Sequence, residues 1–192
     1  MEKIMTTDKI VSFDDEKLIV VDEQDSVLEY RIKTECHQGE GILHRAFSIF
    51  IFNSKKEVLI QKRSAQKLLW PDFWSNSCCS HPRQGETLEY AAKRRLKEEL
   101  GLETDLIYLY TFQYHANFGT IGSERELCAV LIGRSGDPVR INPNEIAEWK
   151  YIDIEILTND LHKNPDVFTP WFKMEWQRLT GEYMDRIHSL FR

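Results

Sequence analysis

Residues 74–102 read WSNSCCSHPRQGETLEYAAKRRLKEELGL and contain the clearest periodic pattern of the chain. Within this stretch, apolar side chains recur every four positions between residues 86 and 101, at Leu88, Ala92, Leu96 and Leu100. Side chains four apart share one face of an α-helix, and glycine, here Gly101, is the residue that most often ends one. The pattern therefore predicts an amphipathic helix over residues 86–101.

The segments on both sides of this helix have the apolar runs and alternation of β-strands. Expected strands span 18–21, 27–31, 44–52, 57–63, 106–115, 124–132 and 147–152, and a last helix spans 171–191. In that last helix we expect apolar contacts from Trp171, Met174, Leu179, Ile187 and Leu190. The order of strands, helix, strands and helix predicts an α+β fold, an α/β/α sandwich with a mixed sheet and N-terminal β-strands.

The composition is that of a single domain over residues 1–192, with 42% hydrophobic and 29% charged residues. The 25 basic and 31 acidic residues give a net charge of −6, so no general positive field exists to attract nucleic acid. No apolar run reaches the roughly 20 residues of a membrane span, and the N-terminal residues lack the apolar core of a signal peptide. We therefore expect a cytoplasmic protein with no nucleic-acid partner and no membrane partner.

The four cysteines do not have the spacing of a disulfide framework or of a C-x-x-C pair, so we expect free thiols. They are Cys36, Cys78, Cys79 and Cys128. A free cysteine is usually a small buried hydrophobe, and this interpretation suffices for all of them except Cys79, which lies in the motif described below.

Two groups of charged residues have both a structural and a functional interpretation. Arg95, Glu98 and Glu99 share one exposed face of the predicted helix, where an Arg95–Glu99 pair on a solvated face is the simpler reading. The run from Gln61 to Lys67 contains three basic residues and no acid, which is either a solvated face or an anion site. Neither pattern decides between its interpretations alone.

Three histidines and two glutamates make a mixed set of nitrogen and oxygen donors: His37, His44, His81, Glu124 and Glu126. Glu124 and Glu126 are two apart on a predicted strand and so point to the same face. Such a set suits a borderline divalent ion, Mn²⁺ or Zn²⁺. For any single histidine a structural role is the commoner one, and His115, His162 and His188 are left with that role.

The stretch from Ser80 to Leu102 resembles the Nudix box, in which helix carboxylates hold a divalent cation against a diphosphate. Two positions depart from the box: Ser80 stands for its first glycine, and Arg95 for a glutamate that ligates metal and often activates water in the hydrolases. The segment SNSCCSHP, residues 75–82, closely resembles the active-site motif of the type I isopentenyl-diphosphate isomerases, a Nudix branch. This resemblance extends from about residue 28 to residue 171, and it implies a Nudix core over about 42–175 with an N-terminal strand extension and a C-terminal helix.

The resemblance implies a metal-dependent interconversion of isopentenyl and dimethylallyl diphosphate by protonation and deprotonation of the alkene. The implied catalytic residues are Cys79, Glu126, Tyr114 and Trp171. The implied substrate-binding residues are Lys33, Arg63, Lys67, Ser80 and Arg95. The implied metals are one Mn²⁺ or Zn²⁺ in a site of three histidines and two glutamates (His37, His44, His81, Glu124 and Glu126) and one Mg²⁺ on Glu99 that bridges to the diphosphate. The expected partner is a small allylic or homoallylic diphosphate, and we expect a monomer.

Two other functions fit part of the pattern. The box alone would predict a Nudix diphosphohydrolase, although Arg95 in place of the glutamate and the motif around Cys79 speak against hydrolysis. A non-catalytic module that binds metal and diphosphate would keep the ligands, but it has no need of both Cys79 and Glu126. Isomerisation is the function that uses all of these residues.

Overall fold

The computed structural model describes residues 9–192, and residues 1–8 lie outside the described part. The strands are β1 (Lys17–Val21), β2 (Val27–Ile32), β3 (His44–Phe52), β4 (Val58–Arg63), β5 (Trp74–Ser75), β6 (Cys78–Ser80), β7 (Leu106–Phe118), β8 (Gly122–Arg134) and β9 (Ile146–Ile152). The helices are α1 (Lys33–His37), α2 (Leu88–Leu100), α3 (Ile154–Lys163), α4 (Pro170–Glu182) and α5 (Met184–Ser189), with a 3₁₀ turn, η1, at Pro165–Val167. All the predicted strands and the predicted central helix are present.

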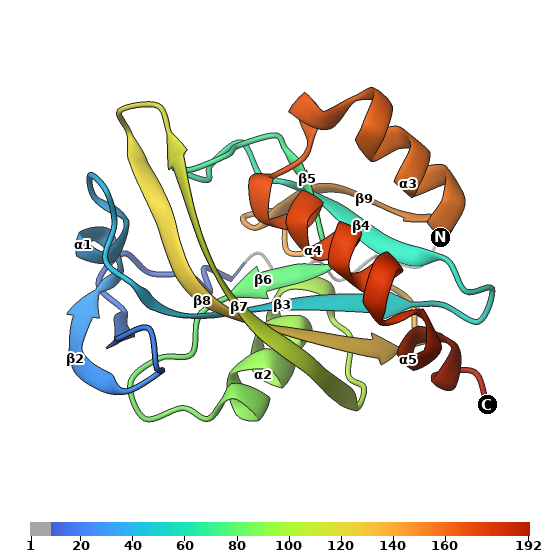
Figure 1. Ribbon diagram of the computed structural model, residues 1–192, viewed down its shortest axis with the longest axis horizontal. Coiled ribbons are helices and arrows are strands. Elements are labelled where there is room, and N and C mark those ends of the chain that lie inside the picture. The colour runs from blue at the N-terminus through green and yellow to red at the C-terminus, as the bar shows by residue number, and fades with distance from the viewer. Residues whose placement is uncertain (1–8) are drawn as a thin grey trace.

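Strand β3 lies inside the mixed sheet and organises the strands around it (Figure 1). Along its whole length it pairs in parallel with β8, and on its other edge it pairs antiparallel with β1, β4 and β6. Strand β7 continues the sheet beyond β8 through a long antiparallel hairpin. The β8 and β6 strands therefore flank β3 on opposite sides, and this brings distant parts of the chain together.

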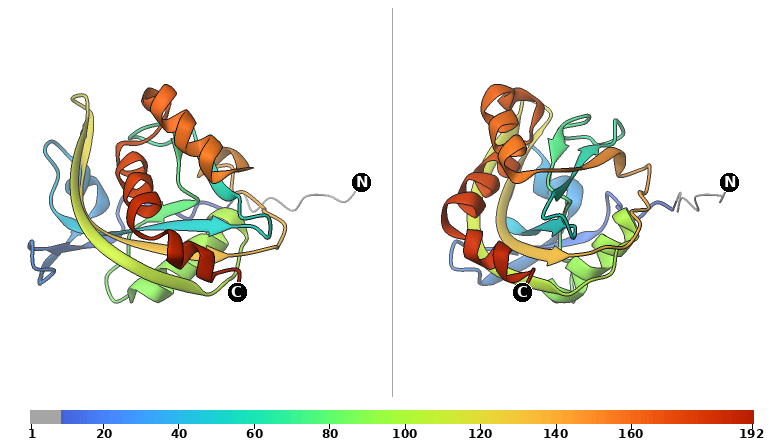
Figure 2. Two further views of the ribbon diagram at one scale, coloured as in Figure 1. Left: turned by 45° about the vertical axis from the view of Figure 1, so that its right-hand side comes forward. Right: turned by 90° about the vertical axis from the view of Figure 1, so that its right-hand side faces the viewer.

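Helices cover both faces of the sheet, as the two turned views show (Figure 2). Residues that alternate along β3 point to opposite faces, because successive side chains of a strand do so. Phe47, Ile49 and Ile51 pack with Leu96 and Leu100 of α2. On the other face, Phe50 and Phe52 share a core with Phe172, Trp176 and Leu179 of α4. This arrangement confirms the predicted α+β sandwich.

Helix α2 has the limits that its end residues predict. The hydroxyl of Thr87 accepts a hydrogen bond from the backbone N–H of Tyr90 at 3.2 Å and caps the first turn. Gly101 ends the helix with a φ of 67°, which favours glycine. A Cβ atom at Gly101 would also lie 3.0 Å from the Cβ of Arg140, so the next loop packs closely against this end.

The expected helix over 171–191 is wrong in its continuity, because α4 ends at Glu182 and α5 begins at Met184. Tyr183 separates them with φ −123° and ψ 15°, outside the helical region. Met174 is also a wrong assignment, since its side chain is exposed, whereas Leu179 and Ile187 are buried as expected. The pattern did not predict α1 or α3. None of the helices between residues 9 and 192 is long and apolar enough to span a membrane.

Candidate active site

A cavity of about 500 Å³ opens between the β7–β8 hairpin, the loop after β4 and the start of α4. Its walls include twelve of the residues singled out from the sequence: Lys33, His37, Arg63, Lys67, Cys79, Ser80, His81, Arg95, Tyr114, Glu124, Glu126 and Trp171. The other two, His44 and Glu99, are buried and contact wall residues. The structure thus brings all the predicted site residues to one place.

The histidine–glutamate cluster consists of His37, His44, His81, Glu124 and Glu126, and one donor atom from each lies within 4.8 Å of the others. The register of the sheet explains this. His44 on β3 is paired with Glu126 on β8, and Glu124 is two residues before Glu126 on the same face. His81 follows β6 directly, and His37 ends α1 beside β8.

The hydrogen bonds of two imidazoles leave their Nε2 atoms available as ligands. Nδ1 of His37 contacts the carbonyl of Lys33 at 2.8 Å, and Nδ1 of His44 contacts the carbonyl of Ile42 at 2.7 Å. A ring nitrogen next to a carbonyl carries the proton, so an imidazole held in this way has a lone pair on Nε2 whenever it is neutral. Nε2 of His44 is buried and has no hydrogen-bond partner within residues 9–192. These donors fit a divalent cation.

The pKa values of the two carboxylates in this cluster shift in opposite directions. Burial raises the pKa of Glu126 well above its usual range, and the charge of Glu124 raises it further. Burial also opposes ionisation of Glu124, but the charge and hydrogen bond of His37, whose Nε2 lies 2.8 Å away, bring its pKa down to about 2. The hydroxyl of Tyr114 donates a 2.6 Å hydrogen bond to Oε2 of Glu126. Glu126 is therefore oriented by a neutral donor while its neighbour stays ionised.

Cys79 lies on the other side of β3 from Glu126. Its register partner on β3 is Ser48, which is four residues after His44, the partner of Glu126. Cys79 and Glu126 thus project from the same face of the sheet, one on each side of β3. Burial raises the pKa of the Cys79 thiol to about 12, so this group is a protonated thiol at neutral pH. Cys78 points to the other face and is fully buried, as expected.

Arg63 shapes the wall next to Cys79. Its guanidinium donates to the backbone carbonyls of Trp70 and Leu69 at 3.0 and 2.9 Å. The same group lies 5.3 Å from the ring centre of Trp171, and its Nη1 is 3.9 Å from Sγ of Cys79. Trp171 in turn packs edge-on against Trp70. The thiol is therefore bordered by one fixed cation and an aromatic wall.

The cation cluster occupies the other end of the cavity and consists of Lys33, Lys67 and Arg95 with the carboxylates Glu99 and Glu145. Nη2 of Arg95 lies 2.6 Å from Glu99 and 3.2 Å from Glu145. Lys67 pairs with Glu145. Lys33 pairs with Glu16 at 3.5 Å and donates to the hydroxyl of Ser12. Three cations from three elements thus converge within one pocket.

The expectation that Arg95 and Glu99 lie on an exposed helix face is wrong. The two residues are 3% and 2% exposed, because the turn before β9 and the N-terminal segment cover this face of α2. Nη1 of Arg95 donates to the carbonyl of Val11 at 2.7 Å. The Arg95–Glu99 pair predicted from spacing is present, but it is a buried pair and part of the cavity wall.

Glu145 is a site residue that the sequence patterns missed. It is 3% exposed and lies on the cavity wall. Burial opposes its ionisation, but Lys67 and Arg95 lower its pKa to about 2. The local sequence INPNE contains no periodicity that would mark its glutamate. No local signal in the sequence marks this glutamate, because its cation partners Lys67 and Arg95 are distant in the chain.

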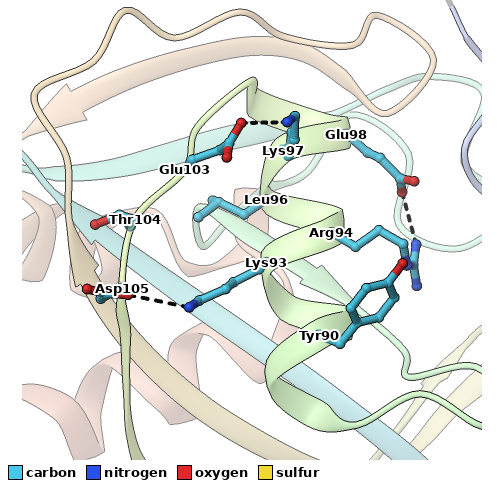
Figure 3. Close-up of a pocket in the computed structure, with 9 residues that line it drawn as sticks. All are labelled: Tyr90, Lys93, Arg94, Leu96, Lys97, Glu98, Glu103, Thr104 and Asp105. Carbon is cyan, nitrogen blue, oxygen red and sulfur yellow. Dashed lines mark hydrogen bonds and ion pairs between the residues drawn. The ribbon is translucent and has the colours of Figure 1, made fainter.

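A second cavity, of about 590 Å³, lies along the outer side of α2 and contains none of the predicted site residues (Figure 3). Its charged side chains already pair with one another. Lys97 contacts Glu103 at 2.6 Å, and Arg94 contacts Glu98 at 2.9 Å. This groove offers charge pairs on an open helix surface, whereas the first cavity combines buried acids, a thiol and metal donors.

The walls of the first cavity can perform acid–base chemistry on a small anionic molecule. Its cation cluster suits a diphosphate, its histidine–glutamate cluster suits a metal ion, and Cys79 and Glu126 hold protons on two sides of one space. The rings of Trp171 and Tyr114 lie 6.1 Å apart and both line the cavity, where an aromatic wall tolerates an apolar or cationic group.

Comparison with known proteins agrees with this chemistry. The NUDIX domain model matches residues 42–172. The chain is 41% identical to isopentenyl-diphosphate Delta-isomerase 1 of Photorhabdus laumondii over 90% of this chain and 99% of that protein. It is 40% identical to the isopentenyl-diphosphate Delta-isomerase of Serratia proteamaculans (90% and 96% covered) and 38% identical to that of Schizosaccharomyces pombe (83% and 80% covered).

Solved structures show the same fold at lower sequence identity. A crystal structure from Deinococcus radiodurans aligns with a TM-score of 0.66 and 24% identity, covering 92% of this chain and all of that one. The MutT protein from Methanosarcina mazei aligns with a TM-score of 0.60 and 17% identity, covering 73% of this chain and 94% of that one.

Proposed function

The chain belongs to the isopentenyl-diphosphate Delta-isomerase family within the Nudix superfamily, and we propose that Cys79 and Glu126 exchange the protons of the isomerisation. The reaction interconverts isopentenyl and dimethylallyl diphosphate. In one direction, the terminal methylene carbon gains a proton, and the carbon two positions away loses one as the double bond moves. A positive charge develops on the tertiary carbon between these events.

The placement of Cys79 and Glu126 is the observation on which the proposal rests. A 1,3-proton shift needs a donor at one end of the three-carbon unit and an acceptor at the other. The two side chains project from one face of the sheet, from the strands that flank β3. We propose them as a pair whose roles exchange with the direction of the reaction. Tyr114 orients the Glu126 carboxyl through its hydrogen bond.

The aromatic wall would favour the cationic intermediate and exclude water. Trp171 is 3% exposed and Tyr114 is 6% exposed, and both line the cavity. An aromatic face near a desolvated cation contributes up to about 2 kcal/mol. We propose that Trp171 faces the tertiary carbon in this way, with the Arg63 guanidinium 5.3 Å from the ring centre.

The histidine–glutamate cluster would hold one Mn²⁺ or Zn²⁺ through His37, His44, His81, Glu124 and Glu126. A divalent ion bound there supplies positive charge that favours the ionised form of Glu126. We propose Glu99 as the ligand of a second ion, Mg²⁺, at the diphosphate, since Mg²⁺ prefers few carboxylates together with phosphate oxygens and water.

The substrate is a small diphosphate, and we propose that the cation cluster binds it. Lys33, Lys67 and Arg95 supply the charge, with Arg63 and Ser80 on the adjoining wall. We also propose a monomer and a single domain over residues 1–192, with the Nudix core at about 42–175.

The experiment that tests the function is proton NMR of the metal-loaded protein with isopentenyl diphosphate in D₂O. Isomerisation produces dimethylallyl diphosphate with deuterium on a methyl group, because the acid supplies a solvent-derived proton. Release of phosphate would instead identify a diphosphohydrolase. Substrate that binds and stays unchanged would indicate a non-catalytic module. The Cys79→Ala variant is the matched control and should give no labelled product.

A further inference from the structure

Glu145 is a buried acid in a pocket for an anion, which is an unfavourable position unless the acid has a task. Its side chain is 4% exposed. Its Oε2 atom contacts Nζ of Lys67 and lies 3.2 Å from Nη2 of Arg95. One carboxylate oxygen therefore joins two of the cations proposed to bind the diphosphate, although those cations come from elements 28 residues apart in sequence (95 − 67).

The backbone around Glu145 is bonded to both of those elements. Its carbonyl accepts a hydrogen bond from the N–H of Ser64 at 2.9 Å, at the start of the loop that contains Lys67. The N–H of Asn142, in the same turn, donates to the carbonyl of Glu99 at 2.8 Å, at the end of the helix that contains Arg95. The backbone of the turn 142–145 is thus fixed relative to both elements, and from it the Glu145 side chain contacts both cations.

We propose that Glu145 is a positioning residue for the diphosphate, holding Lys67 and Arg95 at the separation at which both contact the substrate. This inference rests on the proposed function, because it assumes that those two cations bind the diphosphate. Glu145 itself does not touch the substrate in this role, and it acts through the two side chains that it contacts.

The need for such a residue follows from charge and flexibility. Burial lowers the pKa of Lys33, and the nearby charges of Lys67 and Arg95 lower it further, so the three cations repel one another. The Lys67 side chain is 22% exposed and has a route to solvent. A long lysine side chain loses considerable rotamer entropy when it is fixed. Before the substrate binds, the Glu145 carboxylate reduces the repulsion between the cations and restricts the rotamers of Lys67.

The sign of one measured effect separates positioning from simple charge. If Glu145 only added negative charge to the pocket, its neutralisation would strengthen the binding of an anion. If it positions Lys67 and Arg95, neutralisation weakens binding although the pocket becomes more positive. The two interpretations therefore predict opposite changes in KM.

The test compares Glu145→Gln with Glu148→Gln in the metal-loaded enzyme. Glu148 is a matched control, three residues after Glu145. It also pairs with a lysine, Lys62, at 3.0 Å, but its side chain is exposed. For Glu145→Gln we expect KM for isopentenyl diphosphate and the inhibition constant of inorganic pyrophosphate to rise together by about ten-fold, with kcat nearly unchanged. For Glu148→Gln we expect the wild-type values of both.

A double variant gives a second readout that a general loss of structure would not produce. If Glu145 acts through Lys67, its substitution should raise KM less in a Lys67→Gln background than in the wild type. Glu145→Asp keeps the charge but is shorter, so it should give an intermediate KM. Should Glu145→Gln fail to fold, this aspartate variant carries the same test.

The inference would be overturned if Glu145→Gln left KM unchanged, lowered it, or reduced kcat alone. Additive effects on KM in the double variant would also overturn it. A raised Mg²⁺ requirement at constant KM would instead make Glu145 a metal ligand. Calorimetric titration with pyrophosphate keeps this inference separate from the proposed function. If the wild-type protein is inactive, the proposed function is wrong. If that protein still binds pyrophosphate more tightly than Glu145→Gln does, the positioning role is supported.

Discussion

The two ends of the cavity bury charge in different ways. In the cation cluster, Lys67 and Arg95 each contact a carboxylate within the protein, and Glu145 joins them. In the histidine–glutamate cluster, three imidazole rings lie with centroids 4.8 to 5.2 Å apart, and Nε2 of His44 has no hydrogen-bond partner among residues 9–192. The first end therefore pairs both of these cations with acids of the protein itself. The second pairs His37 with Glu124 and His81 with Glu126, each at 2.8 Å, but it leaves Nε2 of His44 unpaired, and a cation among these donors would satisfy that atom.

Under the proposed function, this difference explains how one pocket would accept two kinds of ligand. In the cation cluster, Lys67 and Arg95 are already placed and charged before an anion binds, because Glu145 contacts both. An incomplete cluster binds a metal because the metal satisfies atoms that the fold has left unpaired. Four measurements would break or sharpen this contrast, beginning with the largest expected effect.

Cys79→Ala should separate chemistry from binding most sharply. The loss of one proton-transfer group is expected to reduce kcat by about 10²–10⁴-fold. The inhibition constant of pyrophosphate should stay at the wild-type value, because the cation cluster is unchanged. Cys78→Ala is the control, since Cys78 is buried on the opposite face of the sheet and should affect stability alone. Equal losses of turnover in both variants would remove Cys79 from the chemistry.

Metal removal tests the incomplete cluster. A metal present at about 100 times its dissociation constant adds about 2.7 kcal/mol of stability, and chelation should therefore lower the melting temperature by roughly 5 to 10 °C. The measurement is thermal unfolding with and without EDTA. His44→Ala should abolish the chelator effect, whereas His162→Ala, which changes an exposed histidine on α3, should retain it. A chelator effect that persists in His44→Ala would place the metal elsewhere.

Glu175 is a buried acid of a third kind, because within residues 9–192 it pairs with no cation and does not belong to the histidine–glutamate cluster. It lies on α4, where its Oε1 accepts a contact from the thiol of Cys128 at 3.6 Å, and burial raises its pKa to about 8. Between its usual pKa and about 8, the unfolded chain is ionised at this position and the folded protein is not. The free energy of unfolding should therefore fall by up to about 1.4 kcal/mol for each pH unit in that window, and level off above it.

Urea unfolding at several pH values would check this slope. Glu175→Gln removes the titrating group and keeps the shape, so the variant should lose the part of the slope that Glu175 contributes. A variant with the same pH dependence as the wild type would show that Glu175 does not titrate in this range. The contrast matters because Glu145, buried to a similar extent, has its pKa lowered to about 2 by its cations.

Trp171→Phe should give the smallest effect, and it probes the wall between the two ends of the cavity. Phenylalanine is a weaker partner for a cation than tryptophan, so we expect a loss of about 1 kcal/mol in the transition state, or roughly five-fold in kcat. Trp149→Phe is the control, because Trp149 lies on β9 and outside the cavity. Equal rates for Trp171→Phe and the wild type would reduce Trp171 to a packing residue.

The sequence predicted those parts of the fold that depend on local periodicity. Helix α2 and the long strands could be predicted because each has a regular apolar pattern, and Gly101 marks the end of the helix, whereas its start at Leu88, capped by Thr87, lies two residues after the predicted one. Helix α3 was missed although Asp153 caps it and Leu157 and Leu161 face the core, because a ten-residue segment gives a short pattern. The interruption at Tyr183 was missed because apolar residues continue on both sides of it.

The site could be predicted where residue types and spacing belong to a known motif, and not where burial decides. Cys79, His81 and the paired glutamates of β8 lie in recognisable local patterns. The burial of Arg95 depends on contacts with Val11 and Glu145, which are distant in sequence. Glu145 itself lies in a polar loop, where the local sequence gives no reason to expect a buried acid. Tertiary contacts, rather than local preference, make it part of the site.

The parallel register of β3 and β8 limits where the chain can accept insertions. Because side chains alternate along a strand, a slip of one residue in β8 would turn Glu124 and Glu126 toward α2 and bring Arg125 to the metal donors. The β7–β8 hairpin turns near Gly119. An insertion of one residue that shifts the register of β8 would therefore exchange the side chains on its two faces. Libraries built on this scaffold should therefore vary the hairpin tip in steps of two residues, while the polar β1–β2 turn is open to any length.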